Sequence, residues 1–301
     1  MKNQPMRNLH QEHLEDFTLT GDFRALDAIL SDFHLSTKID GSPSIVFGTD
    51  PSNGKFCVGT KSIFNKVKKK ICYTVEDIYD LYDVDTHANL IEILTACLRY
   101  LPRVKGLYQG DFIGFQGTNE YKPNTLVYKF PEVISQKIII AVHTEWKTDG
   151  ELKDAYVYGT APKFNDTDLV KFVDTDAYQV ADCADFAEVI GFIKQMGTMV
   201  EFATPKQAKE IQKQLNACIR EGREIVPEDF ENPNLISLWK VAESVKLDFL
   251  HFCRSADAPK SYLYGEEVNQ EGYVLRTNEI LAKLVDRRTF SHANFVSGRF
   301  Q

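Results

Sequence analysis

A lysine followed two residues later by an aspartate and then a glycine is the first feature of this sequence that can do chemistry. The run is Lys38-Ile39-Asp40-Gly41. A lysine amine attacks phosphorus only when it is deprotonated, and burial or a nearby cation favours the neutral amine by lowering its pKa. Asp40 can orient the amine or bind a metal ion, and Gly41 lets the backbone approach a ligand closely. By itself, however, the tetrapeptide is more typical of a turn with a surface lysine.

Three further pieces follow in order along the chain. Asp111 interrupts the apolar strand pattern Gly110-Asp111-Phe112-Ile113. Glu271-Gly272 leads into an alternating strand pattern, and Lys283 lies in the middle of another apolar run. Each piece alone is explained equally well by an edge strand or a loop. Their order is the informative part: Lys-x-Asp-Gly, Gly-Asp-Phe, Glu-Gly-x-Val, and then a lysine flanked by apolar residues.

With these pieces in this order, the sequence resembles the covalent nucleotidyltransferase superfamily, which contains ATP- and NAD-dependent DNA ligases, RNA ligases and mRNA capping enzymes. The resemblance covers residues 35–160 and 268–286. The chain also looks like a group of uncharacterised ligase-like proteins from large tailed bacteriophages, through residues 59–66 and 283–287. The second resemblance points to a viral origin and carries no information about activity.

The superfamily resemblance implies a role for each matching residue. Lys38 would attack the α-phosphate of ATP, release pyrophosphate and leave a lysyl-AMP. Lys283 would contact the same phosphate as a second catalytic residue. Asp111 would contact the ribose, and Glu271 would bind a catalytic Mg²⁺, with Asp40 beside the nucleotide as a further metal ligand. Mg²⁺ typically takes one or two carboxylates with phosphates and waters, which suits this set.

The implied contacts to nucleotide and nucleic acid form two groups. The implied nucleotide-binding residues are Thr37, Lys38, Ile39, Asp40, Lys61, Asp111, Glu271 and Lys283. The lysines expected to guide a nucleic-acid strand are Lys61, Lys66, Lys68, Lys69 and Lys70. Such a lysine run is equally typical of a solvated surface loop. Phosphoryl-type transfer needs an in-line nucleophile and neutralised phosphate oxygens, which Mg²⁺ and Lys283 would provide.

The sequence departs from the superfamily pattern at several positions. Ser42 follows Gly41, where ligases often have a basic residue. The last motif usually has two lysines, but here the second is Val285, so residues 286–288 are candidates to take over part of its role. His143 ends the strand that normally stacks on the base, and a structural role is the more typical one for a lone histidine there. Eighteen residues follow Lys283, so we expect no OB-fold domain.

The elements that must position these residues give an α+β fold class. Turn residues separate alternating segments at 44–48 and 55–61, which predicts a hairpin directly after Gly41. Helical periodicity covers 8–34 and 74–101, and three segments within 184–255, namely 186–196, 205–221 and 234–253. We therefore predict a ligase-type core of antiparallel sheets flanked by helices. Its predicted parts are the N-terminal core at 1–183, a helical insertion at 184–265 and the final core strands at 266–301.

Composition limits the compartment and the partners. The net charge is −8, which argues against a surface that coats duplex nucleic acid but allows a local basic patch. The six cysteines lack metal-site spacing and predict reduced thiols in a cytosol-like compartment. No apolar run reaches about 18 residues, and residues 1–10 are polar, so we predict no membrane span and no signal peptide. The expected location is cytoplasmic, in the host cell if the protein is viral.

Two classes of function stay open at this level. The first is an ATP-dependent polynucleotide ligase that acts through lysyl-AMP and Mg²⁺, with RNA preferred over DNA because no OB-fold domain is expected; a DNA ligase or a capping enzyme is a variant of it. The second is a non-ligating, ligase-like phage protein that binds nucleotide or nucleic acid, or an enzyme that transfers AMP to another acceptor. In either case the helical block is a candidate surface for a protein partner.

Overall fold

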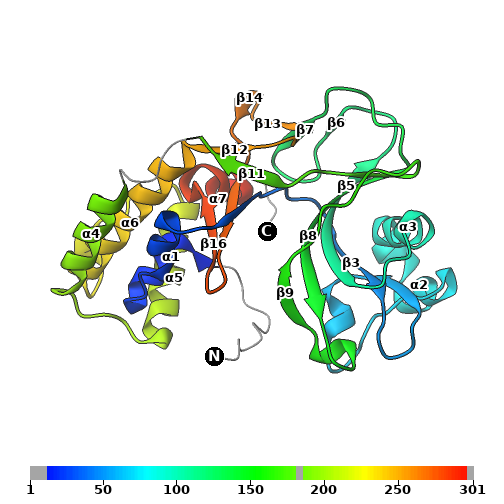
Figure 1. The fold of residues 1–301 in the computed structure, drawn as a ribbon, viewed down its shortest axis with the longest axis horizontal. Coiled ribbons are helices and arrows are strands. Elements are labelled where there is room, and N and C mark those ends of the chain that lie inside the picture. The colour runs from blue at the N-terminus through cyan, green and yellow to red at the C-terminus, as the bar shows by residue number, and fades with distance from the viewer. Residues whose placement is uncertain (1–11, 181–185, 297–301) are drawn as a thin grey trace. The chain divides into compact units, whose positions relative to one another are not determined.

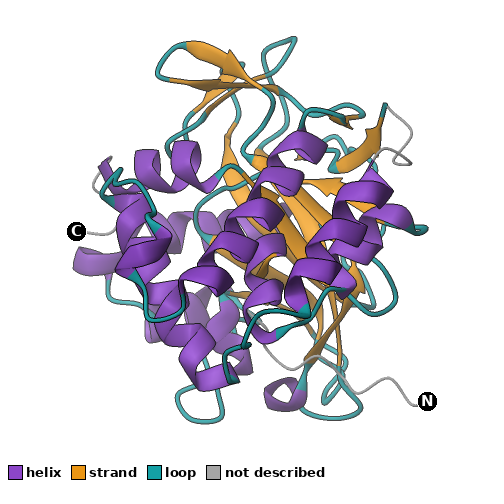
Figure 2. Ribbon diagram, turned by 90° about the vertical axis from the view of Figure 1, so that its left-hand side faces the viewer, coloured by secondary structure: helices purple, strands orange, loops and turns teal. Residues whose placement is uncertain are grey.

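The computed structural model of the chain describes residues 12–180 and 186–296. Helices are interspersed with strands that form several separate sheets (Figure 2). The predicted α+β fold class is confirmed at this level. Of the helices that the structure describes, none combines the length and the apolar character that a bilayer crossing requires.

The chain divides into two compact units, each built from segments that are distant in sequence. Among the described residues, unit 1 comprises Ile39–Thr175 and Asp257–Glu266, and unit 2 comprises 12–38, Asp176–Ala256 and 267–296. These units group the chain differently from the predicted segments 1–183, 184–265 and 266–301. The reason is that the helices within 186–250 share a core with strands from both ends of the chain.

Unit 1 contains a sheet with the strand order β10-β8-β5-β3-β4, with β9 paired to β8. The strands are β3 (Ser44–Thr49), β4 (Phe56–Gly59), β5 (Leu107–Phe115), β8 (Ile138–Lys147), β9 (Tyr156–Thr160) and β10 (Val170–Phe172). The predicted hairpin is confirmed, because β3 and β4 pair antiparallel across the turn at 50–55. Helices α2 (Val75–Leu81) and α3 (Val84–Tyr100) pack against one face of this sheet (Figure 1).

Shorter elements complete unit 1. The 3-10 helices η3 (Lys61–Phe64) and η4 (Leu152–Asp154) share a second apolar cluster with Trp146, whose ring lies 4.3 Å from that of Phe64. A small sheet has the order β14-β13-β7-β6. Its strands are β6 (Glu120–Tyr121), β7 (Val127–Lys129), β13 (Lys260–Leu263) and β14 (Glu266–Val268), the last at the point where the chain passes from unit 1 to unit 2.

Unit 2 contains a sheet with the order β1-β16-β15-β2-β11-β12. The strands are β1 (Glu12–His13), β2 (His34–Thr37), β11 (Asp176–Gln179), β12 (Cys253–Ser255), β15 (Gly272–Arg276) and β16 (Leu281–Val285). Strands from both ends of the chain therefore run side by side, blue against orange and red in Figure 1. The helices of the unit are η1 (Leu14–Thr20), α1 (Arg24–Asp27), η2 (Ala28–Leu30), α4 (Phe186–Gly197), α5 (Pro205–Arg220), η6 (Pro227–Asp229), α6 (Pro233–Leu250) and α7 (Arg287–Val296).

The helix expected over 8–34 is replaced by short pieces in the part of that segment that the structure describes. The 3-10 helix η1 ends at Gly21, which takes a left-handed backbone conformation (φ +75°) and donates its backbone N–H to Thr18 O. The carboxylate of Asp22 then accepts from the backbone N–H of Arg24, where α1 begins. A glycine in this conformation ends a helix readily. Here Gly21 interrupts the helix that the apolar periodicity over 8–34 had predicted.

A buried ionic cluster joins three helices of unit 2. Glu15 and Asp16 of η1 face Lys246 of α6 and Arg287 of α7, and all four side chains are almost fully buried. Lys246 Nζ lies 2.7 Å from Glu15 Oε1, and Arg287 bonds both carboxylates. Trp239 Nε1 also donates to Asp16 at 2.8 Å. Each charge is thus compensated inside the core, as buried charges require.

Candidate functional site

The Lys-x-Asp-Gly motif is divided between the two units. Lys38 is the last residue of the first segment of unit 2, and Ile39, Asp40 and Gly41 begin unit 1. The predicted site residues therefore fall into two groups. Thr37, Lys38, Glu271 and Lys283 belong to unit 2, and Ile39, Asp40, Lys61, Asp111 and the lysines of 66–70 belong to unit 1.

Lys38 continues strand β2 and lies on the face of the sheet opposite the helical core. Its backbone N–H donates to Gly272 O at 2.9 Å, which extends the pairing of β2 with β15. Leu35 and Thr37 are buried, and Thr37 Oγ1 lies 2.7 Å from Ser255 Oγ. Because side chains alternate along a strand, Ser36 and Lys38 lie on the other face.

The Lys38 ammonium forms an ion pair with Glu271. Lys38 Nζ lies 2.9 Å from Glu271 Oε1, and the two side chains are 16% and 8% exposed. This pair brings together the proposed nucleophile and the proposed metal ligand, which are far apart in the sequence. Their partial burial places them in a setting where a charge interacts more strongly than at an open surface.

The glycine after Glu271 is required by close packing of strands. A Cβ atom on Gly272 would lie 2.2 Å from Leu284 O, which no other residue can tolerate. Gln270, the residue before Glu271, adopts a left-handed backbone conformation (φ +59°), which is uncommon outside glycine. The Glu-Gly step read from the sequence thus marks the point where the chain turns sharply into β15, and this turn presents Glu271 to Lys38.

Lys283 lies on the same face of the sheet as Lys38. It pairs with Val274 of β15, which in turn pairs with Ser36 of β2. Residues paired in this way point to one face, and Ser36 shares its face with Lys38. Lys283 also pairs with His13 of β1. Unit 2 therefore brings two of the predicted catalytic lysines and one predicted carboxylate to one face of one sheet.

The residues considered as substitutes for the missing second lysine have structural contacts. Val285 is buried. Arg287 belongs to the buried ionic cluster, and Arg288 Nη2 donates to Glu243 at 3.0 Å. Asp286 accepts from the backbone N–H groups of 288 and 289 at the start of α7. These contacts account for residues 286–288 without a role in binding phosphate.

Asp40 and Gly41 are held in unit 1 by contacts that the sequence did not reveal. The backbone N–H of Asp40 donates to Tyr128 Oη at 2.9 Å, and Asn124 Nδ2 donates to Asp40 O at 2.7 Å. The backbone N–H of Gly41 approaches Asp111 Oδ2 at 3.4 Å. A Cβ on Gly41 would lie 2.2 Å from Phe112 O, so the glycine is required by the approach of β5. No local pattern links Tyr128 or Asn124 to the motif.

Asp111 and His143 lie together on neighbouring strands of unit 1. Asp111 pairs with Ser44 of β3 and Ala141 of β8. Its Oδ1 lies 3.7 Å from His143 Nε2, and His143 Nδ1 lies 2.7 Å from Thr144 Oγ1. His143 is about one third exposed. The structure thus associates the carboxylate predicted to bind ribose with the histidine that the sequence left undecided.

The lysines of the loop after β4 differ in their surroundings. Lys61, Lys66 and Lys68 are exposed. Lys69 Nζ forms an ion pair with Glu151 at 3.1 Å, and Lys70 Nζ lies 4.2 Å from the centre of the Tyr82 ring. Two of the five lysines predicted to bind a strand therefore have partners within unit 1, and three project into solvent.

The carboxylates do not form a compact metal cluster within the described residues. No group of three or more histidine, cysteine, aspartate or glutamate side chains there is placed to hold an ion. Glu271 is the carboxylate that a Mg²⁺ ion bound beside Lys38 would use, and one carboxylate is sufficient where substrate phosphates and waters supply the other ligands. The donor set fits such a site. Asp40, the other predicted ligand, belongs to unit 1.

The cysteines of the described residues carry no site. Cys57, Cys72, Cys97, Cys218 and Cys253 are buried and form no disulfide. Burial raises the pKa of Cys57 to about 12, and the nearby charge of Asp50 acts in the same direction. The Cys57 thiol therefore stays protonated and unreactive at neutral pH. Cys183 lies outside the described residues.

The chain matches the model of a family of unknown function (DUF6267) over residues 8–232 and 226–299. These two matches cover most of the sequence, so the chain belongs to this family. No curated protein matches it. No solved structure matches it either.

Proposed function

For this member of the DUF6267 family, we propose that Lys38 is the nucleophile of an ATP-dependent polynucleotide ligase with the ligase-type nucleotidyltransferase core. The observation that carries the proposal is the grouping of Lys38, Glu271 and Lys283 on one face of the unit 2 sheet, with Lys38 and Glu271 in contact at 2.9 Å. The order of the sequence motifs supports it.

The proposed step is attack of the Lys38 amine on the α-phosphorus of ATP. A bond forms between Nζ and phosphorus, the bond from that phosphorus to the bridging oxygen breaks, and pyrophosphate leaves with the electron pair. The amine releases a proton to solvent. Lys283 lies on the face where the α-phosphate would develop charge, and a fixed cation there stabilises the transition state. The product is a lysyl-AMP that can pass its nucleotide to a strand end.

Glu271 has two partners in this proposal. Without nucleotide it holds the Lys38 ammonium in place. Glu271 would also hold Mg²⁺, which would supply positive charge to neutralise the phosphate oxygens. A carboxylate beside a lysine favours the protonated ammonium, which has no lone pair with which to attack, so engagement of Glu271 by the metal ion would favour the neutral amine. Glu271 therefore positions the nucleophile in the free protein and would serve as the metal ligand when substrate is bound.

The acceptor proposed first is an RNA 5′-phosphate end. The three exposed lysines at 61, 66 and 68 form a local basic loop on an otherwise acidic chain. Phosphate contacts of this kind attract a strand without reading its sequence. RNA and DNA ends are compared as acceptors in the same assay.

The test is intact-mass spectrometry of the protein after incubation with Mg²⁺ and each of ATP, GTP and NAD. We expect a gain of one AMP with ATP and none after Lys38→Ala. The matched control is Lys194→Ala, which removes an exposed lysine paired with Asp27 in the same unit. If the folded protein gains no nucleotide from any donor, the ligase proposal fails. Equal loss of the adduct in both variants would show that Lys38 has no special role.

A second candidate function is a protein that binds nucleotide or nucleic acid without ligation, or that transfers AMP to another acceptor. The Lys38–Glu271 contact itself favours the non-ligating form, because a permanently paired ammonium holds a phosphate but does not attack it. Binding of ATP without a covalent adduct, weakened by Lys38→Ala, would support this function over the first. An adduct that no strand end accepts would support transfer to another acceptor.

A further inference from the structure

Unit 1 contains a cavity of about 500 Å³ that none of the predicted nucleotide-binding residues lines. Three segments form its walls: residues 130–136 between β7 and β8, residues 163–166 before β10 with 171–174 at the end of that strand and after it, and residues 257–259 before β13. Its volume lies within the range of small-molecule sites, about 300–1,000 Å³. The chain thus has a second place where a ligand can bind.

Hydrogen bonds from backbone N–H groups hold two of the three walls. Phe130 N–H donates to Asn119 O at 2.8 Å, and Ile134 N–H donates to Thr118 O at 3.0 Å. Phe172 N–H donates to an Asp166 carboxylate oxygen at 2.8 Å. The third wall leads directly into β13, which pairs with β7. The cavity is therefore formed before any ligand arrives, and binding would need little ordering of the protein.

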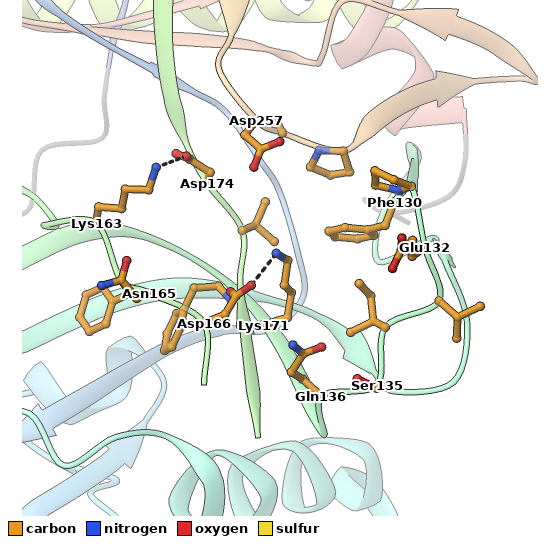
Figure 3. Close-up of a pocket in the computed structure, with 18 residues that line it drawn as sticks. Phe130, Glu132, Ser135, Gln136, Lys163, Asn165, Asp166, Lys171, Asp174 and Asp257 are labelled. Atoms are coloured by element: carbon orange, nitrogen blue, oxygen red, sulfur yellow. Dashed lines mark hydrogen bonds and ion pairs between the residues drawn. The ribbon is translucent and has the colours of Figure 1, made fainter. Parts of the chain in front are cut away.

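The two lysines of the cavity are each matched by an aspartate. Lys171 Nζ lies 2.7 Å from Asp166 Oδ2, and Lys163 bonds Asp174 (Figure 3). Glu132 and Asp257 also line the cavity, on separate loops. In the part of the chain that the structure describes, neither of these two carboxylates is paired with a basic side chain. Four carboxylates against two lysines leave the lining with two negative charges.

Ser135, Gln136 and Asn165 are the uncharged polar residues of the lining, and the remaining side chains are apolar. The rings of Phe164 and Phe172 stack with their centres 5.0 Å apart, and Phe130 lies beside Glu132 (Figure 3). An anionic ligand such as a nucleotide phosphate would meet repulsion here. A cation on an alkyl stem would instead pair with the carboxylates, while its stem and its charge both interact favourably with aromatic rings.

We propose that this cavity is a binding site for a linear polyamine. Two unpaired carboxylates on different loops match a ligand that carries at least two ammonium groups, and the apolar wall between them matches the methylene chain that separates those groups. The volume is also larger than one lysine or arginine side chain needs. The site is independent of the function proposed for Lys38, which lies in unit 2.

The experiment is equilibrium dialysis of the full chain with radiolabelled spermidine at physiological salt. The test variant is Glu132→Gln with Asp257→Asn. The matched control is Asp80→Asn with Glu92→Gln, which removes two exposed charges from helices α2 and α3 of the same unit. A second arm replaces spermidine with butylamine, and a third with a short peptide that carries two arginines.

We expect one spermidine per chain, with affinity reduced at least about tenfold in the test variant, because both carboxylates that lack a basic partner are removed. The control variant should change the affinity less than about twofold. Butylamine should bind at least about tenfold more weakly than spermidine. An equal loss of spermidine affinity in the test and control variants, or no binding of spermidine, would overturn the proposal of a binding site here. Tighter binding of the arginine peptide than of spermidine would overturn the assignment to a polyamine.

Discussion

Two of the lysine–glutamate pairs in unit 2 have nearly the same geometry and different surroundings. Lys246 and Glu15 lie 2.7 Å apart, and neither is exposed at all. Lys38 and Glu271 lie 2.9 Å apart, and the lysine is 16% exposed. The first pair sits among helices, whereas the second lies on the face of a sheet away from the apolar core. The contact alone therefore does not distinguish a structural lysine from a reactive one.

The partners around each pair make the difference. Burial by itself would raise the pKa of Glu15, but Lys246 and Arg287 hold it at about 2. Burial raises the pKa of Asp16 to about 6 against the opposing charge of Arg287. Every charge in this cluster thus depends on a fixed neighbour. Glu271 instead follows a sharp turn and contacts Lys38, which is 16% exposed, and our proposal assigns Glu271 to a metal ion.

The largest expected effect is on stability, in the buried cluster. Lys246→Met leaves Glu15 buried without its closest cation, and breaking a buried ion pair typically lowers the free energy of unfolding by about 3–5 kcal/mol. Urea unfolding followed by circular dichroism measures this. The double variant Lys246→Met with Glu15→Leu should recover much of the loss, because no lone charge then remains. A single variant as stable as the wild type would show that the cluster contributes little.

The next effect concerns activity at the Lys38–Glu271 pair. Glu271→Gln should slow formation of the nucleotide adduct by about a hundredfold, because the amide holds neither the metal ion nor the ammonium well. Its folding should be intact. The rate of adduct formation at saturating ATP, followed by mass, gives the comparison. An unchanged rate would remove Glu271 from the proposed chemistry, whatever its contact with Lys38.

His13 lies near both Glu15 of the buried cluster and Lys283. It leads us to expect that the stability of the protein depends on pH. It pairs with Lys283, and its Nδ1 is buried with no hydrogen-bond partner among the described residues. Burial lowers the pKa of His13 well below its usual value of 6.5, against the charge of Glu15. The unfolded chain therefore binds more protons below pH 6.5, so stability is present above that pH and is lost as the pH falls.

The test compares the wild type with His13→Gln between pH 7 and pH 5. The wild type should lose up to about 1.4 kcal/mol per pH unit relative to the variant. Asp16, whose raised pKa acts in the opposite direction over part of this range, is common to both proteins, so its contribution cancels in the difference. Parallel stability profiles would contradict the burial of a neutral His13.

The smallest effect is expected at an exposed pair in the same unit. Lys194 and Asp27 are in contact, and both side chains are more than 40% exposed. Lys194→Met should change the free energy of unfolding by less than about 1 kcal/mol, because water and salt screen such a pair. The same urea experiment measures it. A loss in the free energy of unfolding as large as that of Lys246→Met would mean that burial does not determine how much each ion pair contributes to stability.

Local patterns in the sequence located many elements. The helix expected over 205–221 is α5 (Pro205–Arg220), where Thr204 and Gln207 form a capping box. The strand expected at 272–276 is β15. Turn residues and apolar periodicity depend on residues that are close together in the sequence, so they predict local elements without knowledge of the tertiary contacts. The expected N-terminal helix failed because one residue, Gly21, favours a left-handed turn at that point.

Long-range contacts were less accessible from the sequence. The motifs predicted that Lys38, Glu271 and Lys283 act together, and the structure places these three on one sheet face. The contacts of Tyr128 and Asn124 with Asp40 join distant segments through backbone atoms, which leave no residue pattern. The buried cluster was also missed, because Glu15 and Arg287 look like surface residues until the helices pack together.

The measurement that tests the central claim most directly is the identity of the modified lysine. Protein incubated with ATP and Mg²⁺ would be digested at a pH that preserves phosphoramidates, and the peptides would be sequenced by tandem mass spectrometry. Our account predicts AMP on Lys38 and none on Lys246. AMP on a different lysine, or none on any lysine of a protein that binds ATP, would contradict it.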